Sequence, residues 1–241
     1  MTKTETRLFG TDGVRGTAGV YPLDRRTVRR LGAALVRALP HRASAPAHIL
    51  IGRDTRESGG WIEAELAQGA IGEGASVTSV GVVPTPAVAY LARAHAHVDA
   101  GVVISASHNP YADNGIKVFS GRGEKFTETV EREIEAIVAD PSWHAGDGDA
   151  VPPPHAALVG SYVEHLKAIL PEASPFKGFR IVIDCANGAT SVVAPELFAD
   201  LGFDTTVIGN EPDGRNINLE CGSTHPERLA AQVVSRGARM G

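Results

Sequence analysis

Short apolar runs alternate with longer amphipathic stretches along almost the whole chain of 241 residues. Apolar residues spaced three and four apart predict helices, whereas short continuous apolar runs predict strands that are covered on both faces. The helices expected on this basis span residues 24–39, 61–73, 84–95, 127–139, 158–170, 192–201 and 226–236. The expected strands span residues 48–51, 77–83, 101–105, 116–119, 180–184 and 205–208.

Because strands and helices alternate in both halves of the chain, the expected fold class is α/β. We expect two successive α/β domains with mixed, mostly parallel sheets flanked by helices. Residues 140–155 break the alternation with four prolines and two glycines, which is typical of a domain linker. The predicted domains are therefore residues 1–150 and residues 156–241.

The composition excludes several classes of function. Hydrophobic content of 43% and charged content of 21% are ordinary for a soluble globular protein. A net charge of −5 gives no general attraction to nucleic acid or to an acidic membrane, so neither is expected as a partner. The one basic run, Arg25, Arg26, Arg29 and Arg30, is interpreted as a solvated helix face. No transmembrane segment and no secretory signal are visible, which favours a cytoplasmic enzyme.

The cysteines and the spaced histidines do not indicate a metal site. Cys185 and Cys221 lie far apart without a CxxC spacing, so neither a disulfide framework nor a cysteine metal site is expected. His95 and His97 lie at the end of a predicted helix, where a spacing of two residues does not bring side chains to one face.

The most informative stretch is GVVISASHNPYADNGIKVF at residues 101–119. Its apolar run predicts a buried strand that leads into Ser107 and His108. Asn109-Pro110 follows as a turn signal, which places the hydroxyl on a constrained loop. In open α/β sheets, ligands bind just outside the carboxyl ends of such strands. The stretch therefore predicts a functional loop.

Residue chemistry alone leaves three roles open for Ser107. It could satisfy local backbone groups in the loop, act as a hydrolase nucleophile with His108, or carry a phosphate. The hydrolase role is disfavoured because adjacent side chains usually point apart and no G-x-S-x-G elbow is present. On spacing alone, Arg15 is a surface loop charge and Lys117 is a strand lysine that faces solvent.

Several blocks of the sequence, in the right order, resemble one family. Residues 101–119 are similar to the phosphoserine loop of the α-D-phosphohexomutases. LFGTDGVRG at residues 8–16 and GRDTRESG at residues 52–59 resemble the first blocks of its phosphoglucosamine mutase branch. IVIDCANGA at residues 181–189 and PDGRNINLECGSTHPERL at residues 212–229 resemble its second domain, so the resemblance covers nearly the whole chain.

The resemblance implies an isomerase that interconverts glucosamine 6-phosphate and glucosamine 1-phosphate. The reaction would pass through a phosphoserine and a bisphosphate intermediate and would feed UDP-N-acetylglucosamine biosynthesis. The implied substrate partner is a hexosamine phosphate, and the oligomeric state stays open, a homodimer being one option. The alternatives are a phosphoglucomutase or phosphomannomutase of the same superfamily, or a non-catalytic fragment that binds phosphosugars.

The resemblance also implies roles for individual residues. Ser107 would carry the phosphate, and Arg15 would bind the phosphoryl oxygens through its guanidinium. Lys117 would act as a general acid or base toward a sugar hydroxyl. His108 would donate a hydrogen bond to sugar or phosphate, with bracing of the turn as the alternative. Ser105 would be structural.

The cluster Arg53, Asp54 and Arg56 in the second block is expected to form an ion-pair network that supports the loop. The family resemblance further implies Mg²⁺ held by the phosphate on Ser107 and by three aspartates. We expect the aspartate ligands beyond residue 241, so the 241-residue chain is expected to be inactive alone. Residues 147–149 read Asp-Gly-Asp, but they lie in the linker and lack the third aspartate, so they are not assigned to the metal.

Overall fold

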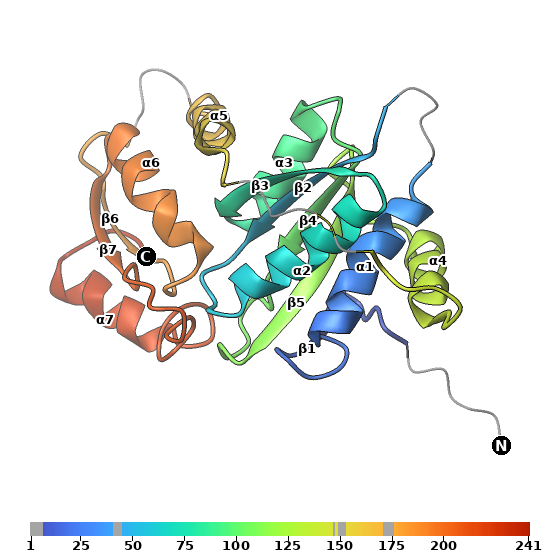
Figure 1. Cartoon of the computed structure of the whole chain (residues 1–241). Helices are drawn as coiled ribbons and strands as arrows, with labels where there is room; N and C mark the ends of the chain where they lie inside the picture. The colour runs from blue at the N-terminus through green and yellow to red at the C-terminus, as the bar shows by residue number, and fades with distance from the viewer. Residues whose placement is uncertain (1–6, 41–44, 147, 149–152, 171–175) are drawn as a thin grey trace.

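The structure is a computed structural model that describes residues 7–40, 45–146, 148, 153–170 and 176–241. Two sheets form within these residues, one of five strands and one of two. The two-stranded sheet lies with α6 and α7 on one side of the molecule, and the larger sheet lies with α1 to α4 on the other (Figure 1). The predicted domain boundary near residue 150 falls outside the described residues.

The elements mostly alternate between strand and helix, except that β5 follows β4 and α5 follows α4 directly. The first half contains β1 (Val14–Thr17), α1 (Arg25–Ala38), β2 (His48–Arg53), α2 (Gly59–Gly72), β3 (Ser76–Val82), α3 (Thr85–Ala94), β4 (Ala100–Ile104), β5 (Asp113–Ser120) and α4 (Glu128–Ala139). The second half contains α5 (Ala156–Lys167), β6 (Arg180–Asp184), the 3-10 turn η1 (Ala189–Val192), α6 (Ala194–Asp200), β7 (Asp204–Ile208) and α7 (Glu227–Ser235).

The larger sheet has the strand order β1-β5-β4-β2-β3. β2 pairs in parallel with β3 and β4, whereas β5 runs antiparallel to both β4 and β1. β6 and β7 pair in parallel. Three of the five pairings in the described chain are therefore parallel, and the predicted α/β fold with mixed, mostly parallel sheets is confirmed.

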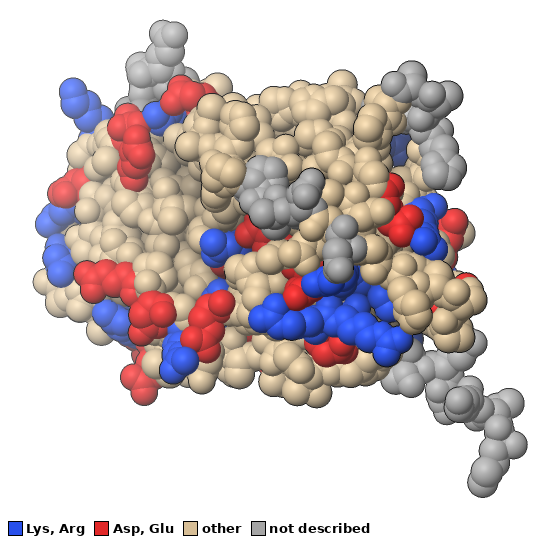
Figure 2. Space-filling model, viewed as in Figure 1, with Lys and Arg blue, Asp and Glu red and all other residues tan. Residues whose placement is uncertain are grey.

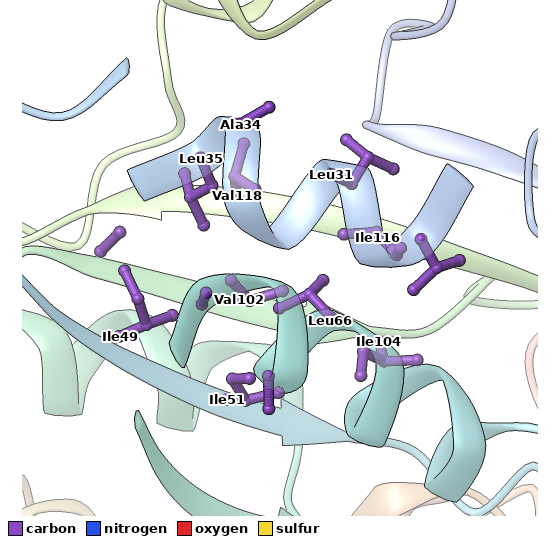
Figure 3. Close-up of a cluster of buried hydrophobic side chains, with 14 of the residues drawn as sticks. Leu31, Ala34, Leu35, Ile49, Ile51, Leu66, Val102, Ile104, Ile116 and Val118 are labelled. Carbon is purple, nitrogen blue, oxygen red and sulfur yellow. The ribbon is translucent and has the colours of Figure 1, made fainter. Parts of the chain in front are cut away.

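Both faces of the larger sheet are covered, which explains the continuous apolar reading of β4, buried at every position. On one face the sheet packs against α1 and α2, as Figure 3 shows. The labelled side chains of this cluster are Leu31, Ala34, Leu35, Ile49, Ile51, Leu66, Val102, Ile104, Ile116 and Val118. On the other face Leu50 and Val103 pack against α3.

The second face of the sheet is shared with the later part of the chain. Tyr162 of α5 and Leu197 of α6 belong to the same apolar cluster as Leu50 and Val103. Tyr90 of α3 also stacks on a histidine of α5, with ring centroids 4.1 Å apart. The two halves of the chain therefore meet through packed side chains as well as through the connecting segment. Within the described residues, no helix combines the length and apolar character needed to cross a bilayer.

Two expectations from the sequence need correction. Residues 14–17 form β1, an edge strand that the apolar pattern did not predict because only one of its four residues is fully buried. The basic run on α1 is not a uniformly solvated face, although Figure 2 shows Lys and Arg side chains gathered over α1 and α2. Arg30 is buried and donates to the backbone carbonyls of Val138, in the last turn of α4, and of Trp143, after the helix. Arg25 and Arg29 both pair with Glu65.

Candidate functional site

The loop between β4 and β5 holds Ser107 in a left-handed conformation, with φ of 58°. For a residue other than glycine this conformation is uncommon and is often found at functional sites. The Ser107 N–H donates to Ser105 Oγ (3.1 Å), and the Asn109 side chain donates to Asp113 Oδ2 (3.0 Å). The Ser107 side chain is exposed, so the loop presents a hydroxyl on a fixed turn.

A buried guanidinium organises this loop from within. Arg56 is 1% exposed, and its Nε–H donates to Asp54 Oδ2 at 3.0 Å. Its four remaining N–H groups donate to backbone carbonyls of the loop, so all five donors of the side chain are used. The accepting carbonyls are those of Ser107, Asn109, Pro110 and Asp113.

The predicted ion-pair network around this loop is confirmed for Asp54 and Arg56, which form a buried pair. Arg53 does not join it, because its guanidinium pairs with Glu63 of α2 at 3.0 Å. Of these three residues, only Asp54 and Arg56 therefore support the Ser107 loop.

Arg15 lies on β1 opposite Gly115 of β5, and Lys117 lies two residues further along β5. Residues two apart on a strand share a face, so the two cations lie on the same face of the sheet. A Cβ at Gly115 would lie 3.2 Å from Arg15 Cγ and 2.9 Å from Ser105 O, so glycine permits this close approach. Because the Ser105 N–H also donates to Gly115 O, Arg15 and Lys117 lie on strands next to the loop that carries Ser107.

The electrostatics of this corner favour an anion. One guanidinium nitrogen of Arg15 pairs with Asp12 Oδ2 at 3.1 Å, but its buried Nε–H has no hydrogen-bond partner among the described residues. Buried donors are normally paired, so this group is a candidate for binding a ligand oxygen. Burial lowers the pKa of the Lys117 ammonium, and the positive charge of Arg15 lowers it further.

His108 follows Ser107 directly and is exposed. Its ring makes no hydrogen bond to any other described residue, so nothing in this part of the chain shows it bracing the turn. All four candidate residues from the sequence, Ser107, His108, Arg15 and Lys117, thus lie in or beside one loop.

Sequence reasoning missed a contribution from the second half of the chain. The Asn218 side-chain amide donates to Ser107 O at 2.9 Å and to Asn109 O at 3.0 Å. Asn218 lies in the block PDGRNINLE, for which the resemblance suggested only membership of a second domain. In the structure Asn218 has φ of 60°, a left-handed conformation that asparagine tolerates better than most residues, but the sequence pattern alone did not mark this position.

The donor set for a divalent cation is incomplete in the described part of the chain. No group of three or more His, Cys, Asp or Glu side chains there could hold a metal ion. Mg²⁺ requires near-octahedral oxygen coordination, and Ser107 could supply one such oxygen. Both aspartates of the Asp-Gly-Asp segment, Asp147 and Asp149, lie outside the described residues. The ring centroids of His95 and His97 lie 5.7 Å apart, but this pair belongs to no group of three or more such side chains among the described residues that could hold a metal ion.

Comparison with known proteins gives one family. The model of the family described as phosphoglucomutase/phosphomannomutase, alpha/beta/alpha domain I, matches residues 6–144. A phosphoglucosamine mutase of Chromohalobacter salexigens is 47% identical over 98% of this chain and 52% of its own length. One of Pseudomonas syringae pv. tomato is 45% identical over 99% of this chain and 53% of its own. The chain thus spans about half the length of these curated relatives.

Solved structures agree with this result. A phosphoglucomutase/phosphomannomutase family protein from Burkholderia thailandensis superimposes with a TM-score of 0.77 at 27% identity, over 95% of this chain and 49% of its own. A protein from Thermus thermophilus that is described as a putative phosphomannomutase superimposes with a TM-score of 0.75 at 26% identity. The match covers 95% of this chain and 51% of that protein's chain.

Proposed function

Since the chain belongs to the phosphoglucomutase/phosphomannomutase family, whose domain I matches residues 6–144, we propose that the whole protein is a phosphosugar mutase. The proposed reaction interconverts glucosamine 6-phosphate and glucosamine 1-phosphate through a phosphate on Ser107. The choice of sugar is supported by relatives called phosphoglucosamine mutase that are 45–47% identical over nearly all of this chain. We also propose residues 1–150 as the first domain and residues 156–241 as part of the second.

The observation that carries the proposal is the exposed, left-handed Ser107 on a turn whose carbonyls are held by the buried Arg56. In the proposed first step, a sugar hydroxyl oxygen attacks the phosphorus of phosphoserine. The bond between phosphorus and Ser107 Oγ breaks, which leaves a sugar bisphosphate and a free serine. In the second step Ser107 Oγ attacks the other phosphorus of the sugar bisphosphate, and the bond between that phosphorus and its sugar oxygen breaks. The sugar oxygen takes up a proton, so that phosphoserine is regenerated and the isomeric sugar phosphate is released.

The neighbouring cations fit this chemistry. Phosphoryl transfer is catalysed mainly by positioning and by stabilising the charge on the transferred group. The unpartnered Nε–H of Arg15 would donate to a phosphoryl oxygen, and His108 would donate to the sugar or phosphate. Lys117 would take the proton of the attacking hydroxyl, for which its lowered pKa increases the neutral fraction near physiological pH.

Magnesium belongs to the proposal for the whole protein. It would neutralise charge on the transferred phosphoryl group. Ser107 would supply one of its oxygen ligands. The described residues alone do not form the site, because they contain no group of three or more candidate protein ligands. The remaining ligands would come from residues outside those described.

Phosphopeptide mapping of the full-length protein tests the proposal directly. We expect a single stable phosphate on Ser107, and we expect Ser107→Ala to abolish turnover of glucosamine 6-phosphate in a coupled assay. Ser105→Ala distinguishes the two serines: it removes the buried acceptor of the Ser107 N–H, so it should lower turnover but leave the phosphate on Ser107. A phosphate on Ser105, or wild-type turnover by Ser107→Ala, would contradict the assignment. Faster turnover of glucose or mannose phosphates would reassign the sugar.

A further inference from the structure

Two carbonyls of the Ser107 loop are each held by two donors from different parts of the chain. Arg56 Nη2 donates to Ser107 O at 3.0 Å and to Asn109 O at 2.9 Å. Asn218 Nδ2 donates to the same two oxygens at 2.9 and 3.0 Å. A carbonyl oxygen has two lone pairs, so each of these oxygens is fully used, once from the end of β2 and once from the second half of the chain.

The chemistry of these contacts fixes the orientation of the Asn218 side chain. Both partners are carbonyl oxygens, which only accept, so the amide must direct its NH₂ group toward them. Both hydrogens of that group are then used, one on each carbonyl. Aspartate has nearly the same shape but would direct a second acceptor at these oxygens, so the site requires the amide.

The backbone of Asn218 is fixed by the end of β6. Its N–H donates to Ala186 O at 2.9 Å, and its backbone is left-handed, with φ of 60°. The Asp184 carboxylate accepts from the backbone N–H groups of Ala186 and Gly222, each at 2.8 Å. These bonds tie the segment that carries Asn218 to the smaller sheet.

The same segment is docked onto the arginine-containing block at the end of β2. The Glu57 N–H donates to Gly214 O at 2.9 Å, and the Glu57 carboxylate pairs with Arg215 at 2.7 Å. The Thr55 hydroxyl donates to Asn187 O at 2.5 Å. The segment that carries Asn218 is therefore held both by the end of β6 and by the block that follows β2.

We infer that Asn218 is a positioning residue for Ser107. It completes the set of donors that holds the left-handed turn, so that the second half of the chain helps to aim the hydroxyl. The inference rests on the proposed function, because the step that it improves is phosphoryl transfer through Ser107. Near-attack geometry is sensitive to small displacements, so a loosened turn lowers turnover more than substrate binding.

The test uses two substitutions in the full-length protein and a matched control. Asn218→Gly keeps the left-handed backbone and removes the amide, whereas Asn218→Asp replaces the donor by an acceptor. Glu220→Gly is the control, because Glu220 lies in the same segment, is exposed and has a similar φ of 52°. The measurements are hydrogen exchange of the peptide covering residues 105–113, thermal unfolding, kcat and KM.

We expect both Asn218 variants to exchange the loop amides about tenfold faster than Glu220→Gly and to lose roughly tenfold in kcat, with KM changed less than about twofold. Loop exchange and kcat equal to those of Glu220→Gly would overturn the inference. Faster exchange with unchanged kcat would also overturn it, leaving Asn218 as an anchor only. Failure of the proposed function is recognised separately, as a wild-type protein that has no mutase turnover and no phosphate on Ser107.

Discussion

Replacing Arg56 by methionine should cost the protein a large part of its stability. The substitution leaves Asp54, which is 4% exposed, as a buried carboxylate without its cation. Removing one partner of a buried ion pair typically costs about 3–5 kcal/mol, because the other charge is left uncompensated. The four loop carbonyls also lose the Arg56 donor, and only Ser107 O and Asn109 O keep a second one, from Asn218. They can regain water if the loop opens, so we take the charge term, about 4 kcal/mol, as the expected loss.

A second variant separates the charge term from simple loss of packing. Asp54→Asn combined with Arg56→Met removes both charges and leaves an amide oxygen that can still accept from the backbone N–H at position 56, as Asp54 Oδ1 does at 3.1 Å. The double variant should therefore be more stable than Arg56→Met alone by about 2 kcal/mol, since no buried charge remains unpaired.

Urea unfolding measures both quantities. With a denaturant slope of about 2 kcal/mol/M, a loss of about 4 kcal/mol lowers the midpoint by about 2 M. The slope itself should be unchanged if the loss is in native-state stability. A loss below about 1 kcal/mol for Arg56→Met, or a double variant no more stable than the single one, would refute the reasoning. Either result would mean that water already reaches the pair.

Three further predictions concern two titratable side chains, Lys117 and Cys185. Lys117→Met in the full-length protein should lower kcat by roughly 10²-fold or more, the usual scale for loss of a general base, and a drop confined to KM would instead indicate simple phosphate binding. The same variant should be more stable than wild type at neutral pH, because the folded state lowers the pKa of Lys117 and so disfavours its charged form. Between the folded and unfolded pKa values of Lys117, the unfolded chain binds more protons than the folded protein, so the free energy of unfolding of the wild type rises with pH. The difference in free energy of unfolding between Lys117→Met and wild type, measured by urea unfolding, should therefore shrink as pH rises toward the unfolded pKa. Cys185, whose pKa burial and then Asp184 raise to about 11, should resist alkylation by iodoacetamide at about pH 8 until denaturant is added, and rapid labelling of the folded protein would contradict its burial.

Local patterns predicted the regular elements well because most of them bury an apolar face. β4 is buried at every position, and α1 begins after Asp24, whose side chain accepts from the Thr27 N–H. β1 escaped prediction because an edge strand with the sequence VRGT shows neither alternation nor an apolar run. Its role depends on pairing with β5, a partner about a hundred residues away in the chain.

The candidate site was predictable only as far as its motifs reach. The loop sequence indicated Ser107, and the charges before α2 indicated a supporting network, but five donors on one guanidinium cannot be read from spacing. Asn218 contacts Ser107 across 111 positions of the chain. Such a contact is decided by how two sheets dock, and a single loop asparagine carries no periodicity that reports it.

The donor set around the loop has a consequence for the charge that Ser107 is proposed to carry. A phosphoserine brings up to about two negative charges to a turn that, as neutral serine, has none. Carbonyl oxygens facing that group would repel it. Arg56 and Asn218 draw the negative ends of the loop's peptide dipoles inward, toward a buried cation and an amide, while the Ser107 side chain stays exposed. The turn is therefore already arranged for an anion when Ser107 is unmodified, and the proposed phosphorylation would require little reorganisation of its dipoles.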